Sequence, residues 1–290
     1  MTSTIDQPYT DGYWDSADGL RLHFRDYPGD AAALPVLCLP GLTRNARDFV
    51  ALAEALAGPR RVLALDFRGR GDSDYAKDWS TYAPATYAAD VLALLDQQGF
   101  ERFVALGTSL GGIVTSLIAA RAPERLAGAV LNDIGPELEE AGRLRIMDYL
   151  GTGGSFPTWV HAARHLADQH GDVHPGWDLE GWLAYAKRVM AIGPGGRIAF
   201  DYDMKIAEPF RTAPDGPPPD MWPAFEALGG RPLVLVRGSQ SDLLSRATAA
   251  QMQQRIAGLE LVEIEGVGHA PTLDEPQARA AIAQLLEKAK

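Results

Sequence analysis

The strongest chemical signal in the chain is a serine set between glycines. Residues 107–111 read Gly-Thr-Ser-Leu-Gly and fit the pattern G-x-S-x-G around Ser109. They follow the apolar run 103–106, which is typical of a buried strand, and they precede a helical stretch that starts at about Leu110. A strand, a sharp turn and a helix in this order form a nucleophile elbow, which lifts a serine hydroxyl out of a sheet. We therefore predict that Ser109 is a nucleophile rather than a serine that only caps a helix.

A nucleophile elbow also needs small residues around the serine, and acyl transfer needs groups that stabilise the oxyanion. The residues two before and two after the serine come close together, and Gly107 and Gly111 meet that need. Acyl transfer requires two N–H donors aimed at the developing oxyanion. We expect one from Leu110, directly after the nucleophile, and one from Leu42, in the loop after the apolar run 36–39.

A serine hydroxyl is a weak nucleophile and needs a base within hydrogen-bond reach. His269 lies in a glycine-containing loop between the last predicted strand, 259–264, and the last predicted helix, 275–288. That position places it at the carboxyl edge of a parallel sheet, the same edge as Ser109. We therefore predict that His269 is the base.

The base in turn needs a carboxylate that orients its ring. Asp242 is the only carboxylate in the loop 237–242, which follows the predicted strand 233–236 and precedes His269 in the chain. The order serine, acid, histidine is the one expected for a nucleophile elbow in an α/β fold. We predict Asp242 as the acid, and Asp133, which follows the strand 129–131, is the alternative.

The elements that must position these residues alternate between short apolar strands and helices. The predicted strands are 36–39, 62–65, 103–106, 129–131, 233–236 and 259–264, and the predicted helices are 45–57, 86–98, 110–121, 246–256 and 275–288. A hairpin, 12–16 and 20–27 around Asp18-Gly19, precedes them. This alternation predicts an α/β fold, with a parallel sheet that helices cover on both faces.

The alternation stops near Gly135 and resumes near Pro232. The intervening segment holds four of the six tryptophans and four of the six histidines, and its stretch 214–219 has the composition of a loop. We therefore predict a core of residues 1–134 and 228–290, with a helical cap, 135–227, inserted over one edge of the sheet.

Six stretches together resemble the α/β-hydrolase superfamily, in particular its single-domain members with a helical cap. They are the loop 39–42, the D-x-R-G-x-G-x-S turn 66–73, the elbow 107–112, the stretch 119–126, the acid loop 237–242 and the histidine loop 268–269. The resemblance implies the α/β-hydrolase fold, a mostly parallel eight-stranded sheet flanked by helices. Serine at the elbow separates the chain from the branches that use aspartate there, the haloalkane dehalogenases and epoxide hydrolases. We interpret the turn 66–73 as mainly structural.

Histidines of the insertion raise the question of a metal. His161 and His165, like His170 and His174, are four residues apart, but no H-E-x-x-H frame is present. We interpret them as parts of solvated surface and predict neither a metal nor a cofactor.

Composition narrows the partners. The chain has 290 residues and a formal net charge of −11, which disfavours binding to nucleic acid. Its one cysteine, Cys38, lies in a predicted buried strand, so no intrachain disulfide can form. No run approaches the roughly 18 apolar residues of a membrane span, and residues 1–10 lack the features of a signal peptide. We expect a cytoplasmic protein.

The expected reaction is hydrolysis of a carboxylic ester of a small, fairly apolar substrate through an acyl-enzyme intermediate. Opening of a lactone or enol-lactone, and carbon–carbon bond cleavage, can use the same residues. A different class is a non-catalytic member of the fold that binds a small molecule. The sequence leaves the substrate and the oligomeric state open, a homodimer included.

Overall fold

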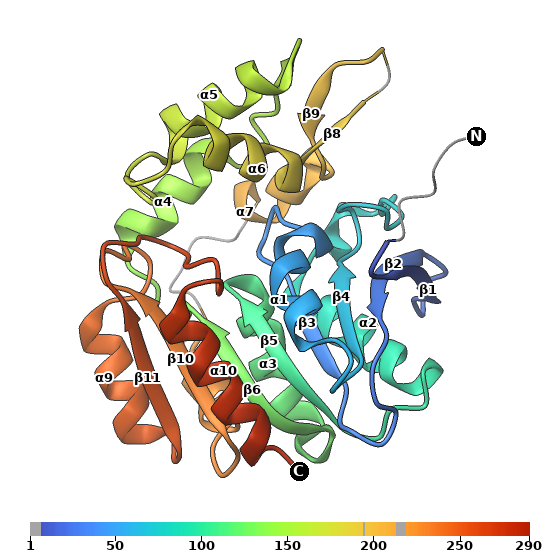
Figure 1. The fold of residues 1–290 in the computed structure, drawn as a ribbon, viewed down its shortest axis with the longest axis vertical. Helices are drawn as coiled ribbons and strands as arrows, with labels where there is room; N and C mark the ends of the chain where they lie inside the picture. Colours follow the sequence, from blue (N-terminus) through green and yellow to red (C-terminus); the bar gives the residue numbers. More distant parts are fainter. Residues whose placement is uncertain (1–6, 194, 213–218) are drawn as a thin grey trace.

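Eight strands form the main sheet, in the order β1-β2-β4-β3-β5-β6-β10-β11 (Figure 1). The computed structural model describes residues 7–193, 195–212 and 219–290. The strands are β1 Thr10–Asp15, β2 Arg21–Tyr27, β3 Val36–Leu39, β4 Val62–Asp66, β5 Phe103–Thr108, β6 Leu126–Asn132, β10 Leu233–Gly238 and β11 Leu259–Ile264. The predicted hairpin is confirmed, since β1 and β2 pair antiparallel, and from β4 to β11 all neighbouring strands are parallel.

The central strands are apolar throughout because both of their faces are covered. In β3, Leu37 and Leu39 belong to one apolar cluster, whereas Val36 and Cys38 belong to a second cluster on the opposite face. The first face is covered by α2 Pro84–Gln97, α3 Leu110–Arg121, α8 Trp222–Glu226 and α9 Arg246–Arg255, and the second by α1 Val50–Leu56 and α10 Pro276–Lys288. This is the α/β-hydrolase fold that the sequence predicted.

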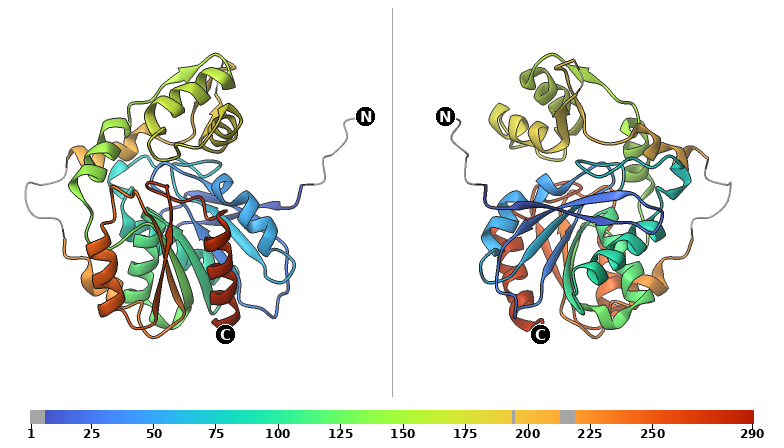
Figure 2. Two further views of the ribbon diagram at one scale, coloured as in Figure 1. Left: turned by 60° about the vertical axis from the view of Figure 1, so that its left-hand side comes forward. Right: turned by 90° about the vertical axis from the view of Figure 1, so that its right-hand side faces the viewer.

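The insertion gathers beyond the strand ends, on one side of the sheet (Figures 1 and 2). Its helices are α4 Glu140–Tyr149, α5 Trp159–His170, α6 Leu179–Val189 and α7 Glu208–Arg211. They are accompanied by a three-stranded antiparallel sheet in the order β7 Ser155–Phe156, β9 Ile198–Phe200 and β8 Met190–Ile192. The sequence predicted an insertion of helices alone, so this small sheet was not expected. Packing of α5 on α6 gives it an apolar cluster of its own.

The bounds of the cap stay a proposal. Helix α8 falls within the proposed cap, 135–227, yet its Trp222 and Phe225 join the apolar cluster that covers the first face of the sheet. The loop predicted for 214–219 lies outside the described residues, apart from Pro219.

In the described ranges, four 3₁₀ helices connect the larger elements: η1 Ala46–Phe49, η2 Trp79–Thr81, η3 Pro123–Arg125 and η4 Met204–Ala207. The predicted helix 45–57 begins as η1 and continues as α1, and the side chain of Asn45 accepts a hydrogen bond from Arg47 N at its start. Among the described residues, no helix combines the length and apolarity needed to cross a membrane.

Candidate active site

Ser109 stands at a sharp turn between β5 and α3. Its φ of 51° lies in a region that non-glycine residues rarely adopt. A Cβ atom on Gly111 would lie 2.0 Å from the carbonyl oxygen of Leu39, and one on Gly107 would lie 2.6 Å from the backbone of Gly111. The predicted requirement for two small residues around the serine is therefore confirmed.

His269 bridges Ser109 and a buried carboxylate. Its Nε2 lies 3.0 Å from Ser109 Oγ, and its Nδ1 lies 2.8 Å from Asp133 Oδ2. Because Nδ1 faces the carboxylate, it carries the proton, and Nε2 is then free to accept the serine proton. The structure brings the predicted nucleophile and base together.

His269 contacts Asp133 and not Asp242, the acid that the sequence predicted. The prediction of Asp242 was therefore wrong, and the alternative, Asp133, takes its place. Asp242 forms a two-point ion pair with Arg145 of α4, with N–O distances of 2.6 and 2.8 Å. Burial alone would raise the pKa of Asp242, but the hydrogen bonds and charge of Arg145 outweigh it and hold the pKa below its ordinary value. Asp133 follows β6 and Asp242 follows the neighbouring strand β10. Position in the chain therefore could not decide which of the two aspartates contacts His269.

The Asp133 carboxylate is fully buried and receives three donors. Oδ1 accepts from the N–H of Gly238, whereas Oδ2 accepts from the hydroxyl of Ser241, at 2.6 Å, and from His269. The preceding residue, Asn132, donates from its side chain to the carbonyl of Pro271 and so holds the loop that carries His269. These contacts fix the carboxylate and the loop that carries the imidazole.

The two expected oxyanion donors belong to segments that adjoin the serine. Leu110 is the first residue of α3, where helix N–H groups have no partner within the helix. Leu42 lines the pocket with Ser109, and a Cβ atom on the neighbouring Gly41 would lie 3.8 Å from Ser109 Cβ. The Arg70 side chain donates through Nε to the carbonyl of Leu42, at 2.9 Å, and thereby orients this loop.

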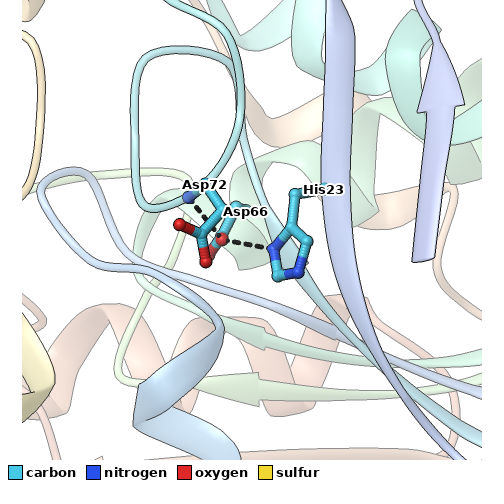
Figure 3. A group of neighbouring side chains, drawn as sticks. All are labelled: His23, Asp66 and Asp72. Carbon is cyan, nitrogen blue, oxygen red and sulfur yellow. Dashed lines mark hydrogen bonds and ion pairs between the residues drawn. The ribbon is translucent and has the colours of Figure 1, made fainter. Parts of the chain in front are cut away.

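The turn 66–73 has a structural role, as predicted. Asp66 accepts hydrogen bonds from His23 Nδ1, at 2.7 Å, and from the N–H of Asp72, at 3.1 Å (Figure 3). It also accepts one from the N–H of Ala46, at 2.6 Å. Burial alone would lower the pKa of His23, but the hydrogen bond and charge of Asp66 outweigh it and raise the pKa above its ordinary value. Asp66 thus joins β2, β4 and the start of η1, next to the loop that carries Leu42.

A pocket opens at Ser109 between the core and the cap. Its apolar lining includes Leu42, Phe49, Ile146, Leu166, Val173, Val189 and Phe200, and its polar lining includes Arg44, Asp48, Tyr149, Arg145, His170, His174, Tyr185, Arg188 and Tyr202. The cap backbone also contacts the base loop, since Gly268 N donates to the carbonyl of Val173. The pocket is therefore mixed in character and closed partly by the insertion.

Sequence reasoning missed most of the polar lining. His170 and His174 line the pocket instead of forming a solvated surface, and His174 stacks on Trp177 at 3.8 Å between ring centroids. Burial, together with the charge of nearby arginines, lowers the pKa of His170 to about 4 and that of His174 to about 3. Both rings are therefore neutral near pH 7. The one signal available was the concentration of histidines in the insertion.

Comparison with known proteins agrees with this architecture. The profile of the family described as the alpha/beta hydrolase fold matches residues 35–276. The chain is 34% identical to a 3-hydroxybutyrate-oligomer hydrolase from Cupriavidus necator, over 91% of each chain, and 26% identical to an esterase from Mycobacterium tuberculosis, over 84% of this chain and 79% of the other. The crystal structure of an alpha/beta hydrolase from Novosphingobium aromaticivorans superposes with a TM-score of 0.92 at 61% identity, covering 97% of this chain and 99% of that one. The fold, the strand order and these matches agree, and the chain belongs to the α/β-hydrolase family.

Proposed function

We propose that the protein is a serine hydrolase that cleaves a carboxylic ester, with Ser109 as nucleophile, His269 as base and Asp133 as the acid. The observation that carries this proposal is the unbroken hydrogen-bond chain from Ser109 Oγ through the imidazole to the buried carboxylate. Side chains at this spacing activate a hydroxyl that is otherwise a weak nucleophile.

The reaction follows from this geometry in two halves. Ser109 Oγ attacks the ester carbonyl while His269 Nε2 takes its proton, and the N–H groups of Leu110 and Leu42 stabilise the oxyanion. The imidazolium, stabilised by Asp133, then protonates the leaving alkoxide, and an acyl-enzyme remains. Water, deprotonated by His269, attacks the acyl carbon, and the proton returns to Ser109 as the acid is released.

The proposed substrate is a small ester with a largely apolar body. The apolar side chains of the pocket supply a surface for the acyl chain or the alcohol. The relative from Cupriavidus necator is named a hydrolase of 3-hydroxybutyrate oligomers, and such oligomers are chains of short aliphatic esters. Its similarity over 91% of both chains supports an aliphatic ester here.

Covalent labelling and turnover test this proposal together. A fluorophosphonate probe should modify the peptide that contains Ser109, and p-nitrophenyl butyrate should be hydrolysed by the wild type but not by Ser109→Ala. Ser80→Ala, an exposed serine outside the pocket, is the matched control and should behave like the wild type. Equal turnover by Ser109→Ala and the wild type would refute the mechanism. Lactones and vinylogous diketones belong in the same panel, and a much faster Ser109-dependent reaction with either would replace the ester as the substrate class.

A further inference from the structure

We propose that the pocket binds a free carboxylate of the ester substrate, and that the guanidinium of Arg188 is its partner. This inference rests on the proposed ester hydrolysis and specifies the substrate as a monoanion. The acidic composition of the chain gave no indication of it, because the pocket brings together three arginines that are far apart in the sequence.

That place is the pocket at Ser109. Among the described residues that line it are three arginines, Arg44 from the loop between β3 and η1, Arg145 from α4 and Arg188 from α6, but one aspartate, Asp48. The chain as a whole carries a net charge of −11. A cationic lining against an acidic background favours an anionic ligand.

Two of these arginines already have carboxylate partners. Arg44 pairs with Asp48 at 2.6 Å and also donates to the Tyr185 hydroxyl. Arg145 holds Asp242 by two hydrogen bonds. Their charges are therefore largely neutralised, and they contribute shape and hydrogen-bonding capacity more than net charge.

Arg188 differs from both, because no carboxylate in the described part of the chain forms an ion pair with it. Its Nε, like that of Arg44, is buried without a hydrogen-bond partner there. A buried guanidinium N–H without an acceptor is costly, so an acceptor supplied by a ligand is favoured. The planar guanidinium can bind both oxygens of a carboxylate at once.

The core holds Arg188 in place. It is the penultimate residue of α6, and its carbonyl accepts from Asn45 Nδ2 at 3.0 Å and from Arg47 Nε at 2.9 Å. The last turn of α6 is thereby fixed to Asn45 and Arg47 of the core. The backbone that carries the Arg188 guanidinium is consequently in place before any substrate arrives, so binding does not have to order this part of the chain.

The single unpaired positive charge of the described lining favours a carboxylate ligand over a phosphate monoester. The low pKa of His170 and of His174 keeps both imidazoles neutral, so Arg188 supplies the one unpaired cation of the described lining. A carboxylate carries one negative charge, whereas a phosphate monoester carries nearly two at neutral pH.

Matched substrate pairs test this inference. One pair is 3-acetoxybutyrate and its N-methylamide, which places the carboxylate on the leaving alcohol. The other is monomethyl glutarate and its N-methylamide, which places the carboxylate on the acyl group. Acid release in a pH-stat gives kcat/KM for each, and the measured quantity is the ratio of the anion to the amide. The variants are Arg188→Gln and, as a matched loss of charge, Arg164→Gln, which alters an exposed arginine of α5 in the same cap.

We expect the anion to be preferred by the wild type in one pair, and that ratio to fall about ten- to a hundredfold in Arg188→Gln, as expected for a charged hydrogen-bond pair. Arg164→Gln should keep the wild-type ratio, and Arg188→Lys should give an intermediate one because it keeps the charge without the planar fork. A wild type that does not prefer the anion in either pair, or an unchanged ratio in Arg188→Gln, would overturn the inference.

A binding measurement separates this inference from the proposed function. If no ester, charged or neutral, is hydrolysed with dependence on Ser109, the proposed function fails. Calorimetric titration of Ser109→Ala with 3-acetoxybutyrate then still decides the subsite. Binding that is lost in the Ser109→Ala, Arg188→Gln double variant supports it, and absence of binding to Ser109→Ala refutes it.

Discussion

Replacing the two candidate acids one at a time gives the sharpest test of the site. In Asp133→Asn, the amide oxygen can still accept from Gly238 N–H, but an NH₂ group in the place of Oδ2 would face His269 Nδ1 as a second donor. The imidazole would then favour the tautomer with the proton on Nε2, which cannot accept the proton of Ser109.

The expected loss is large. In serine proteases the same change lowers kcat about 10⁴-fold, which corresponds to about 5.4 kcal/mol of transition-state stabilisation. The Asp133 carboxylate is fully buried, and its oxygen lies 2.8 Å from Nδ1, so we expect a loss of this order. Asp242→Asn should lower kcat for a neutral ester by less than about tenfold, because its carboxylate is partly exposed and pairs with Arg145.

The assay is steady-state hydrolysis of p-nitrophenyl butyrate by both variants between pH 6 and 9. Urea unfolding monitors the fold, because Asp133 also accepts from Ser241 and its replacement can cost stability. If the folded Asp242→Asn variant lost as much activity as Asp133→Asn, or if Asp133→Asn stayed within tenfold of the wild type, the assignment of Asp133 would be wrong.

Two further predictions concern stability. Gly111→Ala should destabilise the protein by about 1–3 kcal/mol in urea unfolding, because the added Cβ would meet the carbonyl oxygen of Leu39. The control is Gly176→Ala, at an exposed turn with open space around it, which should leave the unfolding free energy unchanged. Equal effects of the two substitutions would contradict the argument. The raised pKa of His23 predicts that its ion pair with Asp66 stabilises the fold fully below about pH 6.5 and that this contribution is lost as pH rises through the raised pKa. The unfolding free energy of the wild type should therefore fall more steeply than that of His23→Gln above about pH 6.5, and parallel curves would refute this reasoning.

The sequence predicted the sheet and the elbow because their signals are local. A buried strand needs a short apolar run, and the turn at Ser109 needs glycine on both sides, so each can be read within a few residues. His269 was identified for a similar reason, since it lies between the last strand and the last helix. The small sheet of the cap was not predicted, because β7, β8 and β9 have only two or three residues each.

The acid and the charged lining depended on contacts between distant segments. Asp133 and Asp242 each follow a parallel strand, and the choice between them depends on Arg145, which is 97 residues from Asp242 in the chain. The sequence of α6 likewise does not reveal that Arg188 faces the pocket. Only the fold of the insertion determines which of its arginines meets a carboxylate and which does not.

The placement of Asp133 has a consequence for how such a site can diversify. The strand before it, β6, pairs directly with β5, and Ser109 N donates to the carbonyl of Asn132, so the spacing between the proposed nucleophile and acid is set by the hydrogen-bond ladder of the sheet. The loop after β10 then supplies no member of the proposed triad: its Ser241 supports Asp133, and its Asp242 holds α4 of the insertion through Arg145. Changes in the insertion can therefore reshape substrate choice while the proposed reacting groups keep their positions.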